Sequence, residues 1–348
     1  MGLKKYDKEA AEAQLKLEEE KKVEETNAIQ EDIEANEAEF QEILKQELSE
    51  DQNAIKERIE AARAEYNVKN KKQKRISTLI SICVLVLLVA ALVLMLTLSS
   101  TWQPIVYVSL GVMILGLAAS FAATKIFKTR LTNEAQIYVA TLYNEINNYV
   151  FRSEEFSNLE IKPNAEMKDE LFIDAKFYKD LRGTRSRNLI SVTYNGENLG
   201  IADLAATVLV KGKTAPMFLG KYYDYENTYS KEGKRILMQV KGGELSRPID
   251  DIEDLPYGEN HKKYVIYSND EDWNKVLTPK TIKDILELKV DKTLIDVIVS
   301  IRPGKTNIGI DYMDEFMNIP VENPLDFANV IRTEKDLEKV LKVLDDIK

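Results

Sequence analysis

Two glycine-lysine-threonine triplets are the residues whose types most directly suggest nucleotide chemistry. They are Gly212-Lys213-Thr214 and Gly304-Lys305-Thr306. A phosphate-binding loop needs another glycine five residues before the glycine of the triplet, and a helix after it whose N-terminus faces the phosphates. Thr207 and Val299 stand at those earlier positions, and strand patterns follow both triplets. Neither triplet therefore predicts a nucleotide site.

Three arginines, Arg182, Arg185 and Arg187, form the densest basic group in the C-terminal two thirds of the chain. A planar guanidinium binds phosphate or carboxylate oxygens through paired hydrogen bonds. A loop that carries three of them is therefore a candidate contact for an anion or a lipid phosphate. The alternative is a solvated turn in which the arginines pair with neighbouring carboxylates.

The other reactive residue types lack suitable partners. The carboxylates of residues 250–254 do not have the alternating spacing and central glycine of a calcium-binding loop. Cys83 is the only cysteine and His261 the only histidine, which excludes an intrachain disulfide and a Cys/His zinc site. No serine elbow accompanies His261. We predict no catalytic residue, no cofactor and no metal site, and we favour a non-enzymatic protein while leaving an enzyme open.

The elements that carry these residues begin with two uncharged stretches, residues 76–98 and 105–124, each long enough to cross about 30 Å of hydrocarbon. The turn between them has no charge and contains Trp102, a residue suited to the membrane interface. Basic residues flank only the outer ends: Lys69, Lys71, Lys72, Lys74, Arg75, Lys125, Lys128 and Arg130.

This distribution of charge predicts a topology. Because basic flanks stay on the cytoplasmic side, both outer ends, and with them the N- and C-termini, are expected in the cytoplasm of a two-span protein of the inner (plasma) membrane. The flanking basic residues and Trp102 are expected to set this topology and to contact lipid headgroups.

Residues 1–75 read as an acidic, extended, coiled-coil-like helix, because they contain no proline and no glycine after Gly2. Residues 24–51 hold eleven acidic residues against one basic residue, Lys45, which disfavours a compact domain. An apolar stripe runs through this part at helical spacing: Ile33, Phe40, Leu44, Leu48, Ile55 and Ile59. The stripe predicts a protein partner or self-association, and the alternative is a solvated, charged helix.

Residues 128–348 predict an α+β domain with a mostly antiparallel sheet. Asn195-Gly196 follows an alternating strand pattern and indicates a hairpin. Thr278-Pro279 predicts the start of one helix and Thr333 the start of a last one. Acidic residues outnumber basic ones in this region, which argues against nucleic acid as a partner.

The run KYVIYSNDEDWNKVLTP, residues 263–279, precedes a helix pattern, a two-strand hairpin, a segment with Phe316 and a Leu/Val-rich helix. This order resembles a bacterial family of two-helix membrane proteins of unknown function, whose members are sometimes mislabelled galanin. The resemblance covers about residues 75–348, and Trp273-Asn274 departs from the small residues expected there. It implies an architecture and no chemistry. A looser match follows the second apolar stretch at Phe151, Ser153 and Phe156.

The sequence as a whole predicts a membrane protein with a long N-terminal helix (1–75), a two-helix transmembrane hairpin (76–127) and a cytoplasmic α+β domain (128–348). We expect a membrane-anchored interaction or scaffold protein that faces the cytoplasm, with the lipid bilayer and a protein as partners. Two alternatives stay open. One is a membrane-associated ligand-binding or hydrolytic module in residues 131–348, and the other is an accessory subunit of a polytopic membrane complex.

Overall fold

The structure is a computed structural model. It describes residues 48–98, 104–163, 165–178, 181–210, 213–240, 255–288, 294–312 and 327–347. It divides into two compact units, which we describe separately. The helical unit comprises Leu48–Tyr149, and the sheet unit comprises Val150–Asn318 and Phe327–Lys348.

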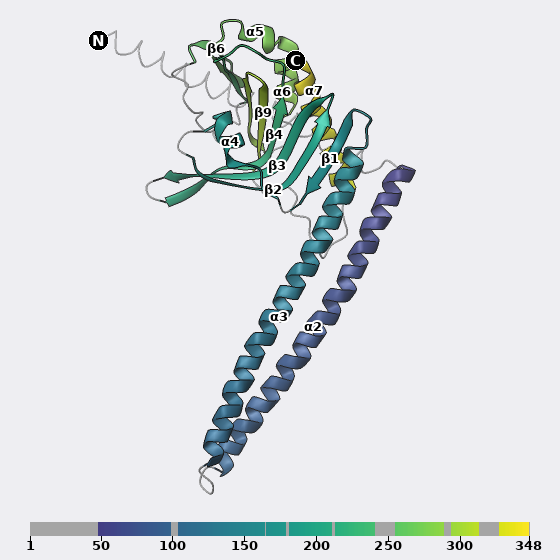
Figure 1. Ribbon diagram of the computed structural model, residues 1–348, viewed down its shortest axis with the longest axis vertical. Coiled ribbons are helices and arrows are strands. Elements are labelled where there is room, and N and C mark those ends of the chain that lie inside the picture. The colour runs from purple at the N-terminus through teal and green to yellow at the C-terminus, as the bar shows by residue number, and fades with distance from the viewer. Residues whose placement is uncertain are drawn as a thin grey trace, which may run out of the picture. The chain divides into compact units, whose positions relative to one another are not determined.

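The helical unit contains two long helices, α2 (Glu50–Leu98) and α3 (Pro104–Val150) (Figure 1). α2 begins at a capping box: the Ser49 N–H donates to Gln52 Oε1 at 2.9 Å, and the Gln52 N–H donates to Ser49 Oγ at 3.2 Å. Of the predicted helical segment 1–75, residues 1–47 lie outside the described residues, and α2 is helical from Glu50 onward. The predicted boundaries at 75/76 and 127/128 fall inside continuous helices, because the change from polar to apolar side chains does not interrupt backbone hydrogen bonding.

α2 and α3 pair antiparallel along their length. Gln52 Nε2 donates to the Tyr149 hydroxyl at 2.9 Å, and the rings of Tyr66 and Tyr138 stack with centroids 5.4 Å apart. A Cβ added at Gly116 would meet a methyl group of Leu88 at 3.4 Å. From one contact to the next, the number of residues that separates them along α2 is similar to the number that separates them along α3. The same register therefore holds from the polar half of the hairpin into the apolar half.

The sheet unit is built on a nine-stranded antiparallel sheet with the order β1-β2-β3-β4-β9-β8-β5-β7-β6. An α+β domain with an antiparallel sheet is confirmed. Its strands are β1 (Phe156–Lys162), β2 (Leu181–Tyr194), β3 (Glu197–Val210), β4 (Lys213–Glu226), β5 (Ile236–Val240), β6 (Tyr257–Asn260), β7 (Tyr264–Ser268), β8 (Leu294–Arg302) and β9 (Lys305–Tyr312).

Turn and cap residues explain where several elements begin and end. Asn195 and Gly196 both adopt positive φ, 50° and 90°, and join β2 to β3 in the predicted hairpin. Thr278 caps α6 as predicted, because its side chain accepts a hydrogen bond from the Thr281 N–H. Thr333 does not start the last helix. The helices of this unit are α4 (Asp169–Ala175), α5 (Trp273–Val276), α6 (Pro279–Glu287) and α7 (Phe327–Asp346).

The early start of α7 has a packing reason. Phe327 and Val330 are buried and extend the helical spacing of Leu337 and Val340 toward the N-terminus, so the apolar face of the helix begins before Thr333. Thr333 is itself buried within the helix. The Tyr194 hydroxyl donates to Asp345 Oδ2 at 2.8 Å, which ties the other end of α7 to the sheet.

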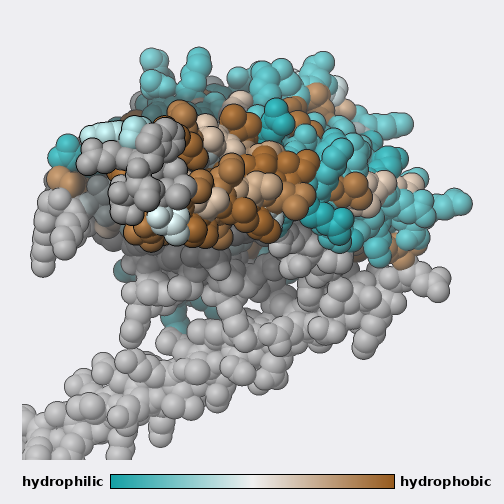
Figure 2. Space-filling model, turned by 90° about the horizontal axis from the view of Figure 1, so that it is seen from below, coloured by the Kyte–Doolittle hydropathy of each residue, from teal (hydrophilic) through white to brown (hydrophobic). Residues whose placement is uncertain are grey.

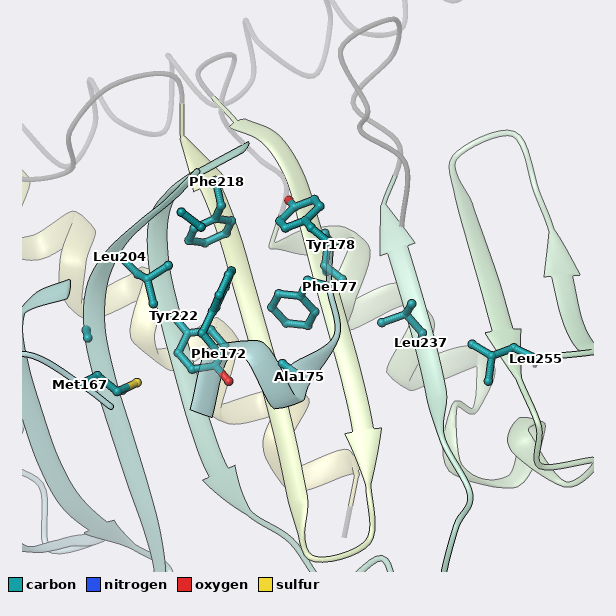
Figure 3. Close-up of a cluster of buried hydrophobic side chains, with 13 residues drawn as sticks. Met167, Phe172, Ala175, Phe177, Tyr178, Leu204, Phe218, Tyr222, Leu237 and Leu255 are labelled. Atoms are coloured by element: carbon teal, nitrogen blue, oxygen red, sulfur yellow. The ribbon is translucent and has the colours of Figure 1, made fainter. Parts of the chain in front are cut away.

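The sheet has two covered faces. We call the face that bears Tyr222 the front face and the one that bears Tyr223 the back face, since neighbouring residues of a strand point to opposite sides. The Tyr222 hydroxyl donates to the Leu171 carbonyl of α4 at 2.7 Å, so α4 lies on the front face. Figure 3 shows the aromatic cluster between α4 and the sheet, in which the ring of Phe172 lies 5.2 Å from Tyr222 and 5.3 Å from Phe218.

Gly309 lies opposite Tyr222 in the sheet and allows Phe177 to pack directly on the backbone of β9. A Cβ at this position would lie 2.7 Å from Phe177 Cε2 and 3.1 Å from Phe218 Cε2, both in fully buried rings. We predict that Gly309→Ala destabilises the sheet unit by about 1–3 kcal/mol through overpacking. The melting temperature of the purified protein should fall by several degrees.

Gly183→Ala is the matched control, because Gly183 also lies in a strand and a Cβ there would meet no atom within 4 Å. An equal melting temperature for Gly309→Ala and the control would contradict the close packing of Phe177 on β9.

Candidate functional site

The most unusual surface of the described residues is apolar and belongs to α2 and α3. Both helices are long and apolar enough to cross a membrane, and only 6% of each apolar window is buried. Large exposed side chains include Leu87 of α2 and Phe121 of α3. Figure 2 shows apolar side chains gathered in one continuous area with hydrophilic side chains around it. An exposed apolar surface of this extent requires a nonaqueous environment or a partner.

The α2–α3 register brings the two basic flanks to one level of the hairpin. Arg75 of α2 and Lys128 of α3 both lie between two contacts that join the helices, Tyr66–Tyr138 and Leu88–Gly116. Within this group Lys69 pairs with Glu65 and Glu134 at 3.0 and 3.3 Å. Trp102 lies outside the described residues. The predicted basic flank residues are all exposed: Lys69, Lys71, Lys72, Lys74, Arg75, Lys125, Lys128 and Arg130.

The C-terminal part of the apolar stripe is buried within the helical hairpin. Ile55 and Ile59 are 5% and 1% exposed within the helical hairpin, whose polar half is also joined by the ion pair between Arg58 and Glu145 at 2.9 Å. Leu48 is half-buried. Ile33, Phe40 and Leu44 lie outside the described residues. A separate protein partner for these remaining stripe residues stays a prediction.

The three arginines singled out in the sequence lie on a strand and not on a loop. Arg182, Arg185 and Arg187 belong to β2, and all three are exposed. The expectation of a loop is wrong because residues 181–187 pair with β3 across several register positions, including Arg187 with Asp203 and Arg185 with Ala205. An anion contact by these arginines stays a prediction.

Next to Arg187 the sheet holds a buried lysine that sequence reasoning missed. Lys221 of β4 is only 7% exposed and lies opposite Asp203 of β3 on the back face. Burial lowers its pKa, and the charges of Asp203 and of Asp336 on α7 act in the opposite direction. A β-bulge with φ of 58° at Asn188 brings its side-chain amide to 2.5 Å from Asp203 Oδ2. These charges join α7 to strands β2, β3 and β4.

A second polar group lies on the front face, near the turn between β8 and β9. Asp224 of β4 accepts hydrogen bonds from Lys305 Nζ at 2.9 Å and from Asn307 Nδ2 at 2.8 Å. Asn307 Oδ1 in turn accepts from Arg302 Nη2 at 2.8 Å. Lys305 is the lysine of the second triplet, and it lies in the β8–β9 hairpin with its ammonium group on a carboxylate.

The Tyr-Ser-x-Asp element of the resemblance, residues 267–270, has a structural use. Ser268 Oγ accepts from the Asp270 N–H at 2.8 Å and donates to the Arg235 carbonyl at 3.1 Å. Asp270 Oδ2 accepts from the Tyr229 hydroxyl and Oδ1 accepts from Lys231 Nζ, at 2.8 and 2.9 Å. The motif therefore holds residues 229–235 against the end of β7, a role that needs no ligand.

The remaining candidates from the sequence are His261 and the carboxylates of residues 250–254. His261 is exposed, stacks on the ring of Tyr264 at 4.7 Å, and accepts a hydrogen bond from the Lys263 N–H through Nδ1. Residues 250–254 lie outside the described part of the chain. Within that part, no group of three or more His, Cys, Asp and Glu residues could hold a metal ion.

No known protein family, curated protein or solved structure matches this chain. The resemblance to the bacterial two-helix family therefore rests on the residues quoted for it alone.

Asp270 gives a prediction about acid stability. Burial by itself would raise the pKa of this carboxyl, but the hydrogen bonds from Lys231, Tyr229 and the Asp272 N–H outweigh it and lower the pKa. A carboxylate with a depressed folded-state pKa stabilises the fold above its unfolded pKa of about 3.9, and this contribution is lost as the pH falls through the folded-state pKa. We expect Asp270→Asn to cost about 1–3 kcal/mol at pH 7, where buried charged hydrogen bonds are lost.

The measurement is thermal unfolding of the purified protein between pH 7 and pH 3. The difference between wild type and Asp270→Asn should narrow at the acid end, while Asp272→Asn, an exposed carboxylate on the same lysine, should change little at any pH. A stability difference that stays constant down to pH 3 would show that Asp270 is not ionised in the fold.

Proposed function

We propose that this chain is a two-span protein of the inner (plasma) membrane that holds a cytoplasmic α+β domain and acts as a non-enzymatic interaction or scaffold protein. The single observation that supports it best is the exposed apolar surface that α2 and α3 share. At 1.5 Å per residue, residues 76–98 would extend about 35 Å, enough for the hydrocarbon thickness of a bilayer.

The polar half of the hairpin supports the orientation. Both basic flanks lie at one level of the paired helices, and the described part of the opposite end carries no charged side chain, which favours the cytoplasm for the basic side. Beyond these flanks α2 and α3 continue, paired by Arg58–Glu145 and Tyr66–Tyr138, for about 40 Å. Along the chain, this paired segment separates the apolar half of the hairpin from the sheet unit.

The scaffold role is favoured over an enzyme because the polar groups of the sheet unit hold structure together. Asp270, through Tyr229 and Lys231, ties residues 229–235 to β7. The charges of Lys221 and Asp336 tie α7 to the sheet. The alternative is an accessory subunit of a polytopic membrane complex. Both roles use the same membrane hairpin, and in the alternative the partner is a polytopic membrane protein. The resemblance to the two-helix membrane family is consistent with both.

The single cysteine allows a direct test of membrane insertion. Cys83 is exposed on α2 within the apolar stretch. In intact membranes a charged, membrane-impermeant maleimide should not label Cys83, because the bilayer covers it, and unfolding in detergent should expose it. Rapid labelling of Cys83 in intact membranes would overturn the two-span arrangement.

Two variants in a Cys83→Ser background report the topology. Glu57→Cys, at an exposed position on the polar half of α2, should be labelled only when the cytoplasmic side is accessible. Ser100→Cys, in the turn between the apolar stretches, should be labelled from outside. The reverse pattern would place the sheet unit outside the cytoplasm.

The stripe residues that precede α2 test the interaction role. Phe40→Ser with Leu44→Ser in the intact membrane protein should abolish the stoichiometric partner or the self-associated species seen by mass measurement in mild detergent. Gln41→Ser with Gln46→Ser, between the stripe positions, is the control. Retention of the same assembly in the Phe40 and Leu44 variant would remove the stripe as the contact, while the membrane hairpin would stand.

A further inference from the structure

Two arginines lie next to each other at the end of strands β5 and β8. Ile236 pairs with Ile301 in the register of these strands, so Arg235 and Arg302, one residue further on each strand, are neighbours. Arg235 Nη2 donates to the carbonyls of Ala175 and Lys176 at the end of α4, which places its guanidinium on the front face. Arg302 reaches Asn307 on the same face.

The acceptors around Arg302 are already engaged. Asn307 Oδ1 takes one hydrogen bond from Arg302 Nη2, and both oxygens of Asp224 are bound by Lys305 and Asn307. Arg302 forms no ion pair with any carboxylate of the described residues. Two positively charged side chains at neighbouring register positions on one face favour an anion beside them.

Two donors at this position have no acceptor. Ser300 lies on the front face two residues before Arg302, is 0% exposed, and its Oγ has no hydrogen-bond partner. Arg302 Nε is also buried without a partner, although the side chain as a whole is only half-buried. A buried donor without an acceptor destabilises the fold, so two in adjacent positions on one strand face indicate a missing acceptor.

We propose that the front face between Ser300, Arg302 and Arg235 binds a phosphate-type oxyanion. Its oxygens would accept from Arg302 Nε and Ser300 Oγ, and the positive charges of Arg302 and Arg235 would attract it. Asn307 holds the Arg302 fork in place, and the α4 carbonyls hold that of Arg235. The site is distinct from the exposed arginines of β2 and does not depend on the membrane hairpin.

A tetrahedral oxyanion fits these donors better than the other charged ligands. A metal cation is excluded because the groups that point here are donors and cations. A planar carboxylate offers two oxygens in one plane, whereas donors from a serine and from two arginines on neighbouring strands approach from different directions. The phosphate group could come from free phosphate or from a phosphate ester such as a lipid headgroup.

The test uses the full chain in detergent or nanodiscs and inorganic phosphate as the probe. Phosphate at constant ionic strength should raise the melting temperature of wild type in a saturable manner, and the protein should broaden the ³¹P resonance of phosphate. Arg302→Gln should weaken binding at least about tenfold, as expected for a lost charged hydrogen bond. Arg152→Gln, which breaks a surface ion pair with Glu334 on the same unit, should bind phosphate as wild type does.

Ser300→Ala separates ligand binding from a structural role. Without phosphate this variant should be as stable as wild type or slightly more stable, because a buried hydroxyl without a partner is removed. With phosphate it should lose most of the increase in melting temperature. Equal responses of wild type, Ser300→Ala and Arg302→Gln, or the absence of any phosphate-dependent change, would overturn the proposal.

The source of the phosphate group is resolved by two further probes. Glycerol 3-phosphate should compete with inorganic phosphate in the ³¹P measurement if the site accepts a phosphate monoester. Vesicles with phosphatidic acid, compared with vesicles of phosphatidylcholine alone, should bind the protein more tightly through Arg302 if the phosphate belongs to a lipid. Competition by neither ester would assign the site to free phosphate.

Discussion

The antiparallel pairing of α2 and α3 is the interaction on which the helical unit depends. It begins at the capping box of Ser49 and Gln52 and keeps one register past Tyr66 and Leu88, so two chemically different halves share one geometry. In the polar half, burial of Ile59 and Leu142 and the pairing of Arg58 with Glu145 stabilise the contact. In the apolar half, side chains face outward and small residues such as Gly116 allow the helices to approach.

The sheet unit differs, because it buries several polar side chains beside its hydrophobic core. On the front face, aromatic rings cover Gly309, and the Asp224 group lies beside them. On the back face, Lys221 and its carboxylates lie under α7. Buried charges of this kind stabilise little by themselves, but each loses its compensation when the pairing of elements changes. They therefore specify one register of the sheet and one position for each helix.

The sequence predicted the local elements well and the contacts between them poorly. Asn195-Gly196 and Thr278-Pro279 are confirmed because turn and cap chemistry acts within four residues. Thr333 was wrongly predicted as a cap because the packing of Phe327, which extends α7, is a long-range effect. The three arginines of β2 were predicted on a loop, because they interrupt the alternation of apolar and polar residues by which a strand is recognised in a sequence. Residues 181–187 nevertheless form a strand, since they pair with β3.

By itself the sequence determined the two uncharged stretches, their basic flanks, the lack of Cys/His chemistry and the α+β character of the C-terminal part. These properties follow from composition and short spacing, which need no knowledge of contacts. The tertiary structure alone decided that α2 starts at Glu50, that Ile55 and Ile59 already have a partner in α3, and that Asp270 serves structure. It also decided that Arg302 lies beside Arg235 in the sheet, because strand register brings together residues that are more than sixty positions apart in the chain.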